Sequence, residues 1–122
     1  MSLYRQIQEA QRRMTDLEEQ LRSGILATEI RDMAAYAGNA HAIAEDVKYD
    51  LDAALNEGEI GEQSEQQFVQ AALDSTRDAI LAAQKVALGT TIDEVRAWML
   101  DFKTHADYAD AYLHAALGHQ ME

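Results

Sequence analysis

Apolar residues recur at alternating spacings of three and four along the whole chain, and no proline interrupts them. This spacing places them along one face of an α-helix, because an α-helix completes a turn in about 3.6 residues. Proline inside such a segment would break it, so its absence leaves long helices intact. The chain is therefore predicted to be all-α and built from long amphipathic helices.

Glycine marks the expected end of each of four helical segments, at Gly24, Gly58, Gly89 and Gly118. At Ser23-Gly24 we expect the glycine to adopt the left-handed conformation that caps a helix. Thr91 and Glu94 form a capping-box signature at the start of the last segment. The predicted core positions are Leu3, Ile7, Ala10, Met14, Leu17, Leu21, Ile30, Met33, Ala37, Ala40, Ala44, Val47, Leu51, Leu55, Val69, Ala72, Thr76, Ala79, Ala83, Val86, Ile92, Val95, Met99, Phe102, Ala106, Ala109, Leu113 and Ala116.

The connections between the segments are short, so consecutive helices are expected to be antiparallel neighbours. A chain of 122 residues is long enough for one hydrophobic core, and residues 1–122 are predicted to form a single domain. The expected architecture is an antiparallel up-down-up-down four-helix bundle. Its first helix, at about 20 residues, is expected to be shorter than the other three.

The net charge of −12 excludes several classes of partner. Nucleic acid and anionic lipid both require a patch of lysine and arginine, which the composition does not favour. No segment approaches the roughly 20 apolar residues of a membrane span, and none resembles a signal peptide, so a cytoplasmic location is expected. The absence of cysteine excludes disulfides and thiolate metal sites.

A short first helix is expected to leave one pole of the bundle uncovered. The apolar residues predicted to gather there are Leu51, Leu55, Ile60, Phe68, Leu113 and Leu117. Exposed apolar surface of this kind is normally covered by a partner, unless the neighbouring loop or the chain ends fold over it. The first hypothesis is therefore a non-enzymatic assembly or adaptor protein without a cofactor, which forms a homodimer and contacts another protein. The expected aromatic anchors on the fourth helix are Trp98, Tyr108 and Tyr112.

The histidines provide a second hypothesis, a small metal- or ligand-binding bundle. His41-x-x-x-Glu45 and His105-x-x-x-x-Asp110 resemble two ligand motifs of the hemerythrins, four-helix bundles that hold two irons with histidines and carboxylates. The resemblance implies a metal site formed by these four residues, for which iron, zinc or manganese is chemically suitable. The third segment, however, has no histidine. The alternative is ordinary pairing of each histidine with a carboxylate four residues away. No catalytic motif is present.

Overall fold

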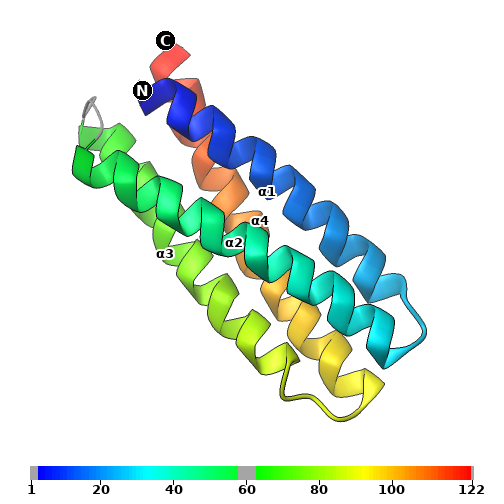
Figure 1. The fold of residues 1–122 in the computed structure, drawn as a ribbon. Coiled ribbons are helices and arrows are strands. Elements are labelled where there is room, and N and C mark those ends of the chain that lie inside the picture. Colours follow the sequence, from blue (N-terminus) through cyan, green and yellow to red (C-terminus); the bar gives the residue numbers. More distant parts are fainter. Residues whose placement is uncertain (1–2, 58–62, 122) are drawn as a thin grey trace.

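The computed structural model describes residues 3–57 and 63–121, and the four predicted helices are present in them (Figure 1). The helices are α1 (Leu3–Leu26), α2 (Ile30–Glu57), α3 (Gln63–Val86) and α4 (Ile92–Met121). The chain reverses direction at each connection, and α2 and α4 lie diagonally opposite each other. The fold is thus the predicted all-α, up-down-up-down four-helix bundle. Within the described residues, no helix combines the length and the apolar character needed to cross a membrane.

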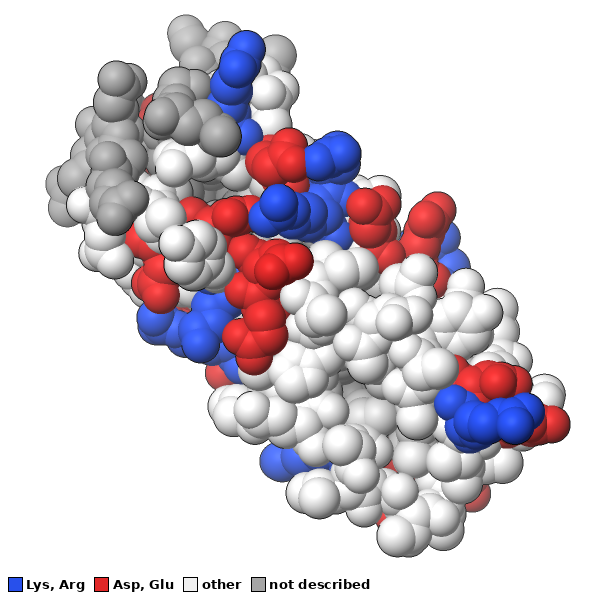
Figure 2. All heavy atoms as spheres, viewed as in Figure 1, with Lys and Arg blue, Asp and Glu red and all other residues white. Residues whose placement is uncertain are grey.

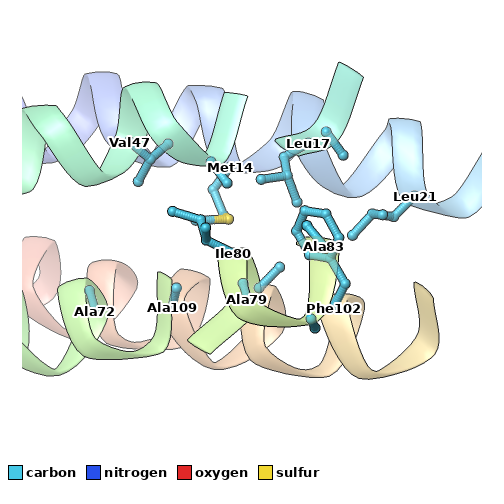
Figure 3. Close-up of a cluster of buried hydrophobic side chains, with 14 of the residues drawn as sticks. Met14, Leu17, Leu21, Val47, Ala72, Ala79, Ile80, Ala83, Phe102 and Ala109 are labelled. Carbon is cyan, nitrogen blue, oxygen red and sulfur yellow. The ribbon is translucent and has the colours of Figure 1, made fainter. Parts of the chain in front are cut away.

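The bundle core follows the predicted three-and-four pattern. Figure 3 shows Leu17 and Leu21 of α1 pointing toward Ala83 of α3 and Phe102 of α4. Nearly all of the predicted core positions are buried; the exceptions with described side chains are Ile30, Leu55 and Ile92, of which Ile30 is 37% exposed. Alanines fill the middle of α3 and α4, and these two helices make the most extensive contact of any pair. Small side chains therefore bring their backbones close together.

Gly24 does not end α1, and the prediction of a left-handed cap there is wrong. The helix continues to Leu26, and no glycine of the described residues has a positive φ. Gly24 is buried, and a Cβ atom added to it would lie 2.8 Å from the Cβ of Tyr36 and would collide with the Cε of Met99. Glycine is needed here because α1 approaches its neighbours closely, not because the backbone turns.

The start of α4 has the predicted capping interactions. The backbone N–H of Glu94 donates to the Thr91 hydroxyl at 3.1 Å. In return, the Glu94 carboxylate accepts a hydrogen bond from the backbone N–H of Thr90 at 3.0 Å. The two interactions satisfy backbone groups that have no partner within the helix, so they fix the point at which α4 begins.

Arg96, in the first turns of α4, caps the C-terminal end of α1. Its Nε donates to the carbonyl of Ile25, and its Nη2 donates to the carbonyl of Ala27, both at 3.2 Å. Carbonyls at a helix C-terminus lack partners within the helix, and a positive charge there is favourable. Arg96 therefore joins the connection between α1 and α2 to the first turns of α4.

Replacing Arg96 with alanine is expected to lower the free energy of unfolding by about 1–2 kcal/mol, because two carbonyls lose a charged donor. Urea unfolding followed by circular dichroism measures the change. Arg96→Lys serves as the control, since it keeps the charge but not the two-pronged geometry, and it should fall between the wild type and Arg96→Ala. Equal midpoints for all three proteins would contradict this role.

Candidate interaction surface

The pole at which α2 ends is not the open apolar patch that the sequence predicted. Leu51 and Leu113 are 0% exposed, and Leu55, Phe68 and Leu117 are partly buried against the core. α1 has 24 residues, as many as α3, and Figure 1 shows its N-terminal end reaching this pole. The expectation of exposure was wrong because α1 covers this end, where its Ile7 is fully buried. Ile60 lies outside the described residues.

The predicted aromatic anchors lie on the flank of α4 that borders α3. Trp98 is partly buried, and the Nζ of Lys85 lies 4.4 Å from the centroid of its ring. Tyr108 and Tyr112 are 55% and 38% exposed, and the Tyr108 ring lies 6.4 Å from that of His105. Both tyrosines are thus accessible, and their contact with a partner stays a prediction.

The proposed metal ligands are not brought together. Three histidines each lie beside a carboxylate of their own helix: His41 with Glu45 at 3.3 Å, His105 with Asp101 at 3.6 Å and His114 with Asp110 at 3.5 Å. Across residues 3–57 and 63–121, no group of three or more histidine, aspartate or glutamate side chains could hold a metal ion. The described histidines therefore follow the ordinary pairing pattern.

Helix geometry explains why His41, Glu45, His105 and Asp110 do not form one site. α2 and α4 occupy diagonal corners of the bundle and touch only slightly. Glu45 borders α3, where it lines a surface hollow with Leu81, whereas Asp110 is placed against Glu18 of α1. Two side chains that lie on different flanks of the bundle cannot share a metal ion.

The first half of α2 forms a surface without charged residues. No aspartate, glutamate, lysine or arginine occurs between Asp32 and Glu45, although charged residues make up 26% of the chain. The outward positions of this stretch are exposed: Ala34, Ala35, Gly38, Asn39 and Ala42. Figure 2 shows the result, with a broad uncharged area over the lower half of the molecule and most of the visible charges above it.

The last turns of α3 and the residues just after it extend this surface. Leu81 of α3 and Leu88, two residues beyond its end, are 56% and 79% exposed. Gln84 is exposed between them, whereas Lys85 extends toward Trp98 of α4. Leu81 and Gln84 line a hollow of about 270 Å³ together with Glu45 and Lys48 of α2 and Arg77 of α3, so charged residues border the surface at this point. Because α2 and α3 are antiparallel, later residues of α3 lie beside earlier residues of α2. We call the combined surface the uncharged face and define it as Ala34, Ala35, Gly38, Ala42, Leu81, Gln84 and Leu88.

The uncharged face has room for the backbone of another helix. Ala34, Gly38 and Ala42 are spaced by four residues and so form one line along α2. A Cβ atom added to Gly38 would have no atom within 4 Å, so this glycine serves no packing purpose within the protomer. Small side chains in such a line allow a second helix to approach closely.

Sequence reasoning did not identify this face, because it followed only the inward-facing alanines of α2 and did not consider the outward ones. Ala37, Ala40 and Ala44 do point inward and are 4%, 0% and 0% exposed. The missing charge on the outward positions was the available signal. Comparison with protein-family models, with curated proteins and with solved structures found no match to this chain.

Proposed function

We propose that this is a non-enzymatic helical-bundle protein that acts by associating with protein chains, and that it forms a homodimer through the uncharged face. The observation that carries the proposal is the absence of charge over an exposed surface of a strongly acidic protein. Two copies with a net charge of −12 each repel one another. The uncharged face is a surface on which they can meet without placing like charges opposite each other.

The side chains of this face support the same conclusion. Leu81 and Leu88 expose apolar surface whose removal from water favours association. The line formed by Ala34, Gly38 and Ala42 lets a partner helix approach α2. In a twofold dimer each protomer contributes the same surface, so α2 would pack against α2 of the partner and be flanked by the exposed leucines. The dimer would then present its other helical faces, including the aromatic flank of α4, to another protein.

Placing a charge at the centre of the face tests this proposal. Gly38→Glu should weaken dimerisation by roughly 100-fold or more, because two carboxylates would be buried opposite each other across the twofold axis. The protomer should still fold, since nothing lies within 4 Å of the new Cβ. Sedimentation equilibrium over a range of protein concentrations measures the dissociation constant.

Gly118→Glu is the matched control. Gly118 is also an exposed helical glycine with nothing within 4 Å of an added Cβ, and the substitution changes the net charge by the same amount. It lies on α4, away from the uncharged face, so this variant should dimerise like the wild type. Equal dissociation constants for the two variants, or a wild type that stays monomeric at all concentrations, would overturn the proposal.

A further inference from the structure

Three carboxyl groups meet at the seam between α1 and α4. Glu18 comes from α1, and Asp107 and Asp110 come from α4. Lys103 is the neighbouring cation, with its Nζ 2.8 Å from Asp107 Oδ2. The side chain of His114 lies at the other end of the group, 3.5 Å from Asp110 Oδ1. Three carboxyl groups at this seam therefore face only one lysine and one histidine.

Two oxygens of this group have no hydrogen-bond donor. Glu18 Oε1 and Asp110 Oδ1 are both shielded from solvent and form no hydrogen bond with the described residues, although the Nδ1 of His114 lies 3.5 Å from Asp110 Oδ1. The Nδ1 of His114 lies 3.0 Å from the main-chain oxygen of Asp110, within hydrogen-bond distance. A buried carboxylate oxygen without a donor is unfavourable, and a proton shared between the neighbouring Glu18 and Asp110 carboxyl groups supplies one.

The environment of Glu18 favours binding such a proton. Burial, the neighbouring Asp110 charge and the contact with Asp107 together raise the pKa of Glu18 from 4.5 to about 7, while Lys103 opposes them. Burial also raises the pKa of Asp110, against the influence of His114. On the other flank of α1, Arg13 pairs with Asp50 of α2, so the α2 side already has its own ion pair.

We propose that Glu18 and Asp110 hold one proton between them, and that this shared proton acts as a pH-sensitive latch that fastens α1 to α4. The folded protein then keeps a proton that the unfolded chain has lost, in the range from about pH 4.5 to about pH 7. Stability from the latch is present at the acidic end of that range and is lost as pH rises through it. Above neutral pH the shared proton is lost, and α1 is held less firmly.

A carbon-13 NMR titration of the glutamate side chains in the wild-type protein tests the proton directly. Glu18 should titrate near neutral pH, at the raised value that its surroundings give it. Hydrogen exchange tests the latch: after correction for intrinsic rates, the opening equilibrium of α1 amides should increase roughly tenfold between about pH 6 and pH 8.

Glu18→Gln removes the titrating group but keeps the length of the side chain and supplies an N–H donor for Asp110. The roughly tenfold increase in the opening equilibrium of the α1 amides between about pH 6 and pH 8 should disappear in this variant. Glu19→Gln makes the same change in net charge at an exposed position and should keep the dependence. The proposal is overturned if Glu18 titrates near its ordinary value of 4.5, or if the two variants depend on pH in the same way.

Discussion

Replacing Phe102 with alanine is expected to lower the free energy of unfolding by about 3–5 kcal/mol, the largest effect of any substitution considered for this protein. Phe102 is 0% exposed and is among the largest fully buried side chains. Figure 3 shows it beside Leu17, Leu21 and Ala83, so its removal leaves a cavity lined by residues of α1 and α3. Chemical unfolding monitored by circular dichroism gives the free energy directly.

Leu100→Ala is the control for this prediction. Leu100 lies on the same helix but is 49% exposed. Truncating its side chain should therefore lower the free energy of unfolding by less than about 1 kcal/mol. The comparison separates core packing from any general effect of shortening a side chain on α4. Similar decreases in the free energy of unfolding for the two substitutions would show that Phe102 does not occupy the centre of the core.

Replacing Gly24 with alanine is expected to destabilise the protein by about 1–3 kcal/mol. This is opposite to the usual result, because alanine inside a helix is normally more stable than glycine by up to about 1 kcal/mol. The new methyl group would lie 2.8 Å from the Cβ of Tyr36, at the root of a side chain that cannot swing away. Relief would require α1 and α2 to move apart.

Gly38→Ala provides the matched comparison, since the same substitution is made at another helical glycine. Nothing lies within 4 Å of the Cβ added there, so the free energy of unfolding of this variant should rise by about 0.5–1 kcal/mol. Both variants are measured by urea unfolding at a protein concentration low enough to keep the chain monomeric. If alanine stabilised the protein at both positions, the close approach at Gly24 would be refuted.

The arrangement of helices could be predicted because one repeating pattern determines it. Residues such as Met14, Val47 and Leu113 recur at the helical spacing and are all buried. The pattern was less accurate at helix ends. Ala54 is buried where Leu55 was predicted, and α1 passes through Gly24. A glycine can end a helix or permit a close contact, and only the position of the neighbouring helix shows which role applies.

The surfaces of interest depend on relations between helices that are remote in sequence. Whether α1 covers Leu51 depends on its position along the bundle axis, which no local pattern specifies. The uncharged face requires the register of α3 against α2, which places Leu81 beside Glu45. The proton-sharing pair similarly joins Glu18 of the first helix to Asp110 of the last. Local periodicity contains none of these relations.

The most direct test of the proposed association surface is a concentration series of amide NMR spectra. If copies of the chain meet through the uncharged face, amide signals of Ala34, Gly38, Ala42 and Leu88 should shift or broaden as the concentration rises. Signals from the outer side of α4, such as that of Gly118, should stay constant. Changes confined to Tyr108 and Tyr112, or spectra that do not depend on concentration, would contradict the account.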